Sequence, residues 1–147
     1  MGRVSDVVLV RWVEPEARDV PGIVSRVREE AQGKPQAVDY VAVVSSDVPV
    51  PDDGVRKALS DTIDEMMEHC RSVHMVIEGR GLRRALVRSL STSIMLLSRH
   101  RGRTFAHDSI ESALRNVTGD DEPSVQRMMA EARLKGLLPA PDAPAGA

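Results

Sequence analysis

Two strand-loop-helix units in the middle of the chain constrain its fold more than any other feature. Residues 40–46 form an apolar, β-branched run, a proline-rich loop follows, and an amphipathic stretch then extends to Cys70. The second unit has an apolar run at 73–78, a turn at Gly79–Gly81 and another amphipathic stretch from about Leu82. Alternation of this kind predicts an α/β layer fold with a parallel or mixed sheet.

The flanking segments fit the same fold. An apolar run at 6–13 predicts a first strand, and apolar residues at helical spacing between 19 and 31 predict a helix after it. A short strand at 103–107 and a helix at 110–117 follow the second unit. These patterns predict three segments, namely an α/β domain of about four strands at 1–119, a C-terminal amphipathic helix at 120–136 and a disordered tail at 137–147.

The composition argues against several classes of function. Cys70 is the single cysteine, so the chain has neither an intramolecular disulfide nor a thiolate metal cage. A net charge of −2 and one residue each of Trp, Tyr and Phe give little support to nucleic-acid binding. The sequence has no signal-peptide pattern and no apolar run long enough to span a membrane. We therefore expect a cytoplasmic protein with no membrane span.

Motifs for catalysis or metal binding are absent from the sequence. His69, His74, His100 and His107 have no partner at i,i+4 spacing on a helix, which argues against a zinc site. Cys70 next to His69 or His74 has the composition of a nucleophile pair, but it falls on the apolar stripe of its predicted helix and is interpreted as core. The chain has neither a GxSxG elbow nor a P-loop. We predict no metal and no cofactor.

The best candidate for a small-molecule site is the turn that precedes the predicted helix at 82–98. Free backbone N–H groups at such a helix start can bind an anion, and arginines beside them would add charge-assisted hydrogen bonds. The predicted anion-binding residues are Gly79, Arg80, Gly81, Arg83 and Arg84. The turn lacks the full GxGxxG pattern, so plain turn geometry is the alternative role of its glycines.

Charge is unevenly distributed along the chain. Residues 52–68 hold six acids, whereas residues 80–103 hold seven arginines and no acid. This polarity suits contact with a protein partner or a second copy of the chain, and the alternative is an ordinary solvated surface. Asp52 and Asp53 at the start of the acidic segment are either a docking feature or simple helix caps.

The order of the predicted elements from 6 to 117 resembles the STAS-like superfamily, which includes the anti-sigma-factor antagonist domains and lipid-binding relatives of the CRAL-TRIO type. The strand and loop at 41–54 and the segment at 103–117 carry the resemblance. Antagonist domains have a phosphoacceptor serine directly before the glycine that opens their second helix. This chain has Asp53 before Gly54 and so lacks the usual phosphoacceptor.

The resemblance implies a non-catalytic regulatory domain that acts through a protein partner. The predicted partner-binding residues are Asp52, Asp53, Gly54 and Arg56. The alternative is a protein that binds a small anionic molecule or lipid at the Gly79–Gly81 turn and the nearby arginines. An enzyme ranks third.

Overall fold

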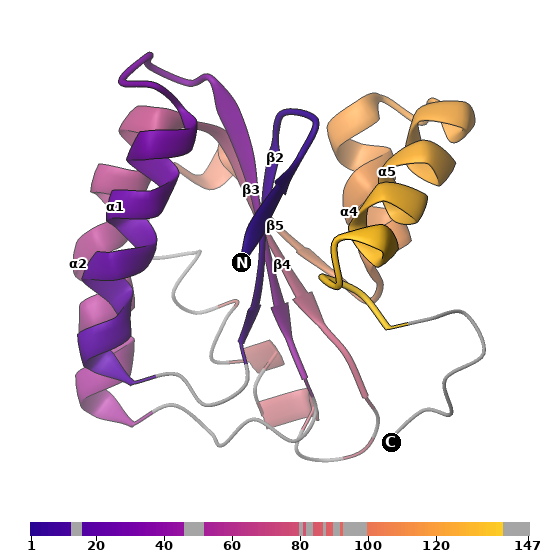
Figure 1. Ribbon diagram of the computed structural model, residues 1–147. Helices are drawn as coiled ribbons and strands as arrows, with labels where there is room; N and C mark the ends of the chain where they lie inside the picture. The colour runs from indigo at the N-terminus through magenta and orange to yellow at the C-terminus, as the bar shows by residue number, and fades with distance from the viewer. Residues whose placement is uncertain are drawn as a thin grey trace.

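A five-stranded sheet lies between two layers of helices in the computed structural model (Figure 1). The structure describes residues 1–12, 16–45, 52–79, 81, 84–86, 88–89, 92 and 100–139. Alternating strands and helices form this three-layer arrangement because each helix covers one face of the sheet. The predicted α/β class with a mixed sheet is confirmed.

The strands have the same order in the sheet as in the chain. They are β1 (Gly2–Val4), β2 (Val7–Trp12), β3 (Val38–Val44), β4 (Cys70–Ile77) and β5 (Thr104–His107). The strands β2 to β5 pair in parallel, and β1 pairs antiparallel with β2. The sequence predicted about four strands and missed β1, because three residues are too short to show a periodic pattern.

The helices divide between the two faces of the sheet. On one face lie α1 (Val20–Glu30), which follows the 3₁₀ turn η1 (Ala17–Asp19), and α2 (Asp53–His69). On the other lie α4 (Ile110–Thr118) and α5 (Glu122–Leu134), while the 3₁₀ turn η2 (Arg101–Arg103) leads into β5. Of the helix predicted at 82–98, only 84–86, 88–89 and 92 are described, and these residues are helical.

Alternate side chains of the strands fill two separate cores. In β2, Val8 and Val10 pack in the core under α1 and α2, whereas Val7 and Leu9 pack in the core under α4 and α5. All seven residues of β3 are buried. A central strand that helices cover on both faces is expected to be apolar throughout, and this explains the continuous run in the sequence.

The C-terminal helix belongs to the same packed unit as the sheet. The predicted boundary at 119/120 falls in the turn between α4 and α5, where Gly119 has a φ of 65° that favours glycine. Val125 and Met129 of α5 lie in the second core. Leu138 joins that core and is only 8% exposed. The chain is therefore still packed one residue beyond 137, the position at which the tail is predicted to begin.

The junction between α2 and β4 differs from the prediction. The sequence pattern predicts that Cys70 belongs to the helix, but it is the first residue of β4 and follows α2 without a loop. The guanidinium of Arg103 donates to the carbonyls of Met67 (2.8 Å) and Cys70, which satisfies groups that a helix end leaves unpaired. Burial raises the pKa of the Cys70 thiol to about 12, in agreement with the predicted core role.

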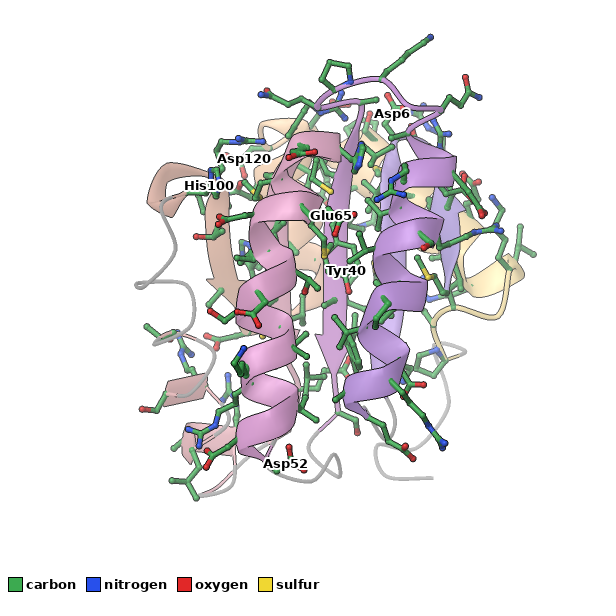
Figure 2. All side chains as sticks on the ribbon, turned by 90° about the vertical axis from the view of Figure 1, so that its left-hand side faces the viewer. Asp6, Tyr40, Asp52, Glu65, His100 and Asp120 are labelled. Atoms are coloured by element: carbon green, nitrogen blue, oxygen red, sulfur yellow. The ribbon has the colours of Figure 1, made fainter. Side chains whose placement is uncertain are left out.

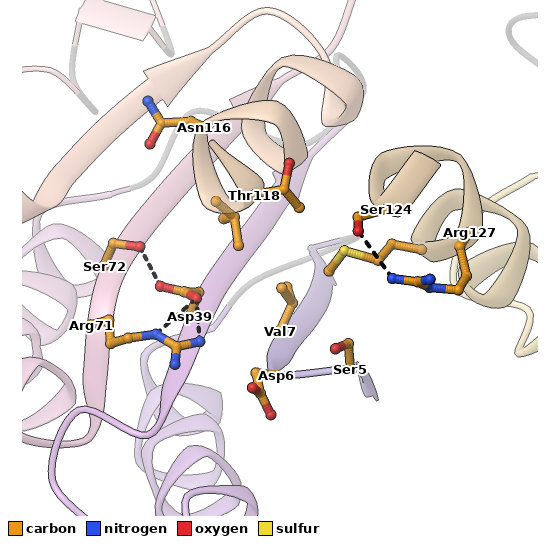
Figure 3. A pocket seen from close by; sticks show the side chains of 12 residues that line it. Ser5, Asp6, Val7, Asp39, Arg71, Ser72, Asn116, Thr118, Ser124 and Arg127 are labelled. Atoms are coloured by element: carbon orange, nitrogen blue, oxygen red, sulfur yellow. Dashed lines mark hydrogen bonds and ion pairs between the residues drawn. The ribbon is translucent and has the colours of Figure 1, made fainter. Parts of the chain in front are cut away.

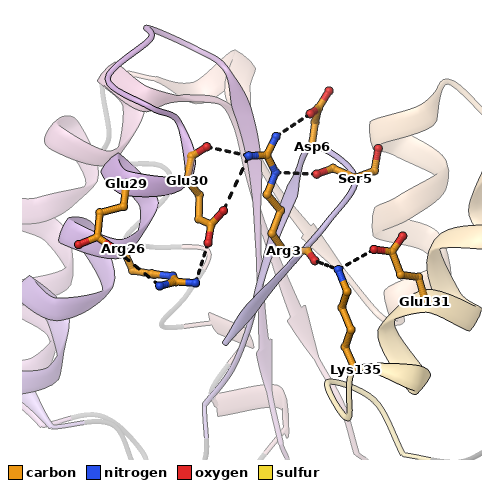
Figure 4. A network of polar contacts seen from close by, with 8 residues as sticks. All are labelled: Arg3, Ser5, Asp6, Arg26, Glu29, Glu30, Glu131 and Lys135. Carbon is orange, nitrogen blue, oxygen red and sulfur yellow. Dashed lines mark hydrogen bonds and ion pairs between the residues drawn. The ribbon is translucent and has the colours of Figure 1, made fainter.

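A polar network holds the β1–β2 hairpin between the two helical layers (Figure 4). The guanidinium of Arg3 donates to the carbonyls of Ser5 (2.7 Å) and Glu30 (2.9 Å) and to the carboxylate of Asp6 (3.0 Å). Lys135, just after α5, donates to the carbonyl of Arg3 at 2.7 Å. The hairpin turn is therefore fixed beside the amino-terminal ends of β2, β3 and β4.

Within the described residues, no helix combines the length and the apolar character that crossing a membrane requires.

Candidate functional site

A cavity of about 340 Å³ opens at the amino-terminal ends of β2, β3 and β4 (Figure 3). We call it the amino-end cavity. Its hydroxyl-bearing side chains are Ser5, Ser72, Thr118 and Ser124, and its charged ones are Asp6, Asp39, Arg71 and Arg127. The hairpin turn, the two central strands, the end of α4 and the start of α5 each contribute to the lining, so only the folded chain forms it.

An irregularity in the pairing of β3 with β4 places two polar side chains opposite Asp39. Val38 pairs with Cys70 and Tyr40 with Val73, so β4 has one extra residue across from Asp39. This β-bulge turns both Arg71 and Ser72 toward the carboxylate. Arg71 donates to Oδ2 at 2.7 Å, and Ser72 donates to Oδ1 at 2.7 Å.

Asp39 is a buried acid whose charge is compensated. Its side chain is 7% exposed, whereas that of Arg71 is 46% exposed. A carboxylate in such a position requires a charge partner and hydrogen-bond donors, and Arg71 and Ser72 provide both. Asp39 and Arg71 therefore form one wall of the cavity with no net charge.

A continuous series of hydrogen bonds leads from Asp39 across the face of the sheet that α4 covers. Ser72 Oγ lies 2.7 Å from His74 Nε2, and His74 Nδ1 lies 2.8 Å from His107 Nε2. His107 Nδ1 in turn lies 3.2 Å from Ser112 Oγ on α4. We call this series, from Asp39 to Ser112, the histidine chain.

The proton positions in the histidine chain follow from its carboxylate end. Ionised Asp39 can only accept, so Ser72 gives it its single hydroxyl proton and must accept from His74 Nε2–H. His74 Nδ1 then accepts from His107 Nε2–H, and His107 Nδ1 accepts from the hydroxyl of Ser112. All the hydrogen bonds therefore point in one direction, toward Asp39, and both imidazoles are neutral.

The surroundings of the two imidazoles favour their neutral forms. His74 is fully buried. Burial, and after it the neighbouring His107, lowers the pKa of His74 from 6.5 to about 4, against a smaller opposing effect of Asp39. Burial also lowers the pKa of half-buried His107, and Asp108 opposes this shift. The Phe105 ring stacks on His74 with 5.0 Å between centroids, which fixes the plane of the imidazole.

The charged groups of the cavity are unequally paired. Asp6 forms an ion pair with Arg3 at 3.0 Å, and Asp39 forms one with Arg71. Arg127 donates to the hydroxyl of Ser124 at 3.0 Å, and no carboxylate lies within ion-pair distance of it in the described part of the chain. The cavity thus has a guanidinium whose charge is not compensated by a nearby acid.

Gly79, Gly81 and Arg84, three of the predicted anion-binding residues, do not line the amino-end cavity. Gly79 and Gly81 have φ values of 99° and 87°, as the turn-geometry alternative expected. Arg84 forms an ion pair with Asp108, and so does Arg88. Arg80 and Arg83 lie outside the described residues, so an anion site at this turn stays a prediction.

The predicted partner-binding residues lie at the carboxyl-terminal ends of the strands, opposite the cavity. Figure 2 shows Asp52 at one end of the molecule and Asp6, which lines the cavity, at the other. Asp52 caps α2 by accepting from the Val55 N–H at 2.8 Å, and Asp53 forms an ion pair with Arg56. Capping, the alternative role, is therefore confirmed for Asp52.

Sequence patterns do not single out Asp39 or Ser72, and helical spacing argues against a joint role for His74 and His107. The two histidines instead lie on neighbouring strands, where side chains on one face recur every second position. Polar residues at 72, 74 and 107 within apolar strands were a usable signal. The one-residue bulge and the strand order were not visible, and they decide which of these side chains meet.

The comparisons with known proteins identify no relative. No family model, no curated protein and no solved structure matches the chain. The STAS-like resemblance therefore stays a prediction. Among the described residues, no group of three or more His, Cys, Asp or Glu side chains could hold a metal ion.

Proposed function

We propose that the protein binds a small hydrophilic anion in the amino-end cavity. The observation that carries this proposal is the charge balance of the lining. Both carboxylates, Asp6 and Asp39, already have guanidinium partners, while Arg127 has only the Ser124 hydroxyl within the described residues. An anion that enters the cavity meets Arg127 as an available charge and the outward side of Arg71 as a second one.

Size and lining support a polar ligand of metabolite size. The volume of about 340 Å³ lies at the lower end of the range for small-molecule sites. Apolar lining is limited to Val7, Val117 and Met128, whereas four hydroxyls and the Asn116 amide surround the space. This lining favours a carboxylate- or phosphate-bearing compound with few apolar groups over a lipid chain. The ligand class agrees with the alternative expected from the sequence, at a different site.

Sulfate is a suitable first probe, and calorimetric titration is the direct test. We expect binding by the native chain and at least about tenfold weaker binding by Arg127→Ala, since hydrogen bonds to charged groups contribute about 1.5–3 kcal/mol. Arg133→Ala is the matched control, because Arg133 lies on the same helix but does not line the cavity. Equal sulfate affinity of native chain and Arg127→Ala would rule out this site.

Thermal unfolding provides a second readout. Sulfate stabilises most proteins without binding a specific site, so a rise in Tm of the native chain alone is not informative. The informative quantity is the difference in the sulfate-induced rise between Arg133→Ala and Arg127→Ala. At a concentration of 100 times Kd, specific binding adds about 2.7 kcal/mol to the free energy of unfolding.

We also propose a docking role for the start of α2, as the resemblance implied. The supporting observation is that Asp53 remains 91% exposed although it pairs with Arg56, whereas Asp52 is used as a cap. A basic protein surface fits this end of the acidic helix.

The docking role is tested by charge reversal. Asp53→Arg is expected to lose any protein that co-purifies with the native chain, and Glu29→Arg is expected to keep it. Glu29 is a suitable control because its side chain is 69% exposed and belongs to α1 of the same helical layer. Retention of the same partner by Asp53→Arg would contradict the docking role.

A further inference from the structure

We propose that anion binding in the amino-end cavity is coupled to the uptake of one proton, which neutralises Asp39 and reverses the hydrogen bonds of the histidine chain. This inference rests on the proposed anion binding and adds how the same site is regulated. It gives a role to a polar series in which each member has a hydrogen-bond partner and which begins with buried Asp39 at the cavity wall and ends at exposed Ser112 on α4.

The hydrogen bonds of the histidine chain can all reverse direction when a single proton is added. A proton from solvent binds Nδ1 of half-buried His107, whose Nε2 proton moves to Nδ1 of His74. The Nε2 proton of His74 moves to Ser72 Oγ, and the hydroxyl proton of Ser72 moves to Oδ1 of Asp39. Every hydrogen bond is kept with donor and acceptor exchanged. Both imidazoles end neutral, and the one net proton neutralises the Asp39 carboxylate.

Occupation of the cavity supplies the reason for this reversal. Arg71 contacts Asp39 and also lines the cavity, so an anion there competes with the carboxylate for the same guanidinium. Two anions beside one cation in a partly buried site repel each other, and neutralisation of Asp39 removes that repulsion. The added proton offsets one negative charge of the bound anion.

Apart from Arg127, the other charged groups around the histidine chain have charged partners of their own. On the strands and the hairpin, Asp39 faces Arg71 and Asp6 faces Arg3. Beside His107, Asp108 is paired with Arg84 and Arg88. The remaining charged groups on α4 and α5 near the site are Glu111, Arg115, Glu122 and Arg127. Within the described part of this face, His74 and His107 link Ser72 at the cavity wall to Ser112 on α4 in one unbroken series.

The test is calorimetric titration of the full chain with sulfate in buffers of different ionisation enthalpy, between about pH 5 and 8, the interval in which histidine chemistry titrates. Sulfate keeps one charge state there, so any proton taken up binds the protein. We expect uptake that approaches one proton per sulfate toward the acidic end. By linkage, sulfate affinity then falls as pH rises, by up to about tenfold per pH unit.

Two variants interrupt the histidine chain at different points. In the reversed series, protonated Asp39 donates to Ser72 Oγ, and His74 Nδ1–H donates to His107 Nε2. Ser72→Ala and His107→Phe each remove one of these acceptors, so in each variant we expect less proton uptake per bound sulfate than in the native protein. If one of them does not fold, the other decides. His100→Gln is the matched control, because it removes an imidazole that is not part of the histidine chain. This variant should retain the proton uptake of the native protein.

The outcomes separate the two proposals. Sulfate binding without proton uptake in the native chain overturns the coupling and leaves anion binding standing. Uptake equal to the native value in a folded His107→Phe or Ser72→Ala variant also overturns it. Absence of sulfate binding overturns both proposals.

Discussion

At the scale of single residues, Asp39 is the group on which the polar site depends. It is buried in the central strand, receives donors from Arg71 and Ser72, and sets the direction of every hydrogen bond in the histidine chain. A buried carboxylate is tolerated in an apolar strand only when such partners exist. Its sequence neighbours, Val38 and Tyr40, give no indication of them, because Arg71 and Ser72 are more than thirty positions away.

Replacement of Asp39 by asparagine tests this assignment. Asp39→Asn keeps the shape of the side chain but removes its charge, so Arg71 loses its anionic partner. We expect a loss of about 1–3 kcal/mol in the free energy of unfolding together with tighter sulfate binding, because one negative charge leaves the cavity wall. Urea unfolding and calorimetry measure the two effects. Weaker sulfate binding in a folded variant would contradict the proposed charge balance.

His74 makes stability depend on pH in a defined direction. Its pKa is about 4 in the folded chain and 6.5 in the reference state, so between these values the unfolded chain binds more protons. The contribution of His74 to the free energy of unfolding is therefore fully present above about pH 6.5. It decreases as pH falls toward 4, by on the order of 3 kcal/mol.

Denaturation at a series of pH values checks this dependence. His74→Phe should unfold with a flatter pH profile across that window, even though the lost hydrogen bonds lower its stability at pH 7. An unchanged slope in His74→Phe would show that burial of this imidazole does not produce the dependence.

At the scale of elements, the ends of helices and strands behave as local chemistry dictates. Asp52 caps α2, Ser109 caps α4 by accepting from the Ser112 N–H at 3.1 Å, and Gly119 ends α4. Such features are readable from sequence because they depend on residues three or four positions apart. The bulge opposite Asp39 is not of this kind, because it depends on the pairing of two strands.

The two adjacent carboxylates at the start of α2 are expected to differ in their effect on stability. Asp52→Ala removes a capping hydrogen bond and should cost about 1 kcal/mol. Asp53→Ala removes a carboxylate that is 91% exposed and should change stability by less than about 0.5 kcal/mol. Chemical denaturation of both variants gives the comparison. Equal losses would show that Asp53, too, has a structural role.

At the scale of the whole molecule, the sheet order follows the chain order, and β3 occupies the centre with helices on both faces. Because β3 pairs along both edges and all its side chains are buried, its amides should exchange with solvent only when the whole chain unfolds. Those of β1, a three-residue edge strand, should exchange through smaller openings. Hydrogen exchange in the native state measures this difference, and equal rates in β1 and β3 would contradict it.

The sequence alone determined the class of fold, the positions of most strands and helices, and the core role of Cys70, because apolar periodicity and capping act over a few residues. It directed the search for a site to residues 52–56 and 79–84, where loops follow strands. Only the tertiary structure brought Asp39, Arg71, Ser72, His74 and His107 together at the opposite edge. Strand order, a one-residue bulge and the packing of α4 and α5 decide those contacts, and each depends on segments far apart in the chain.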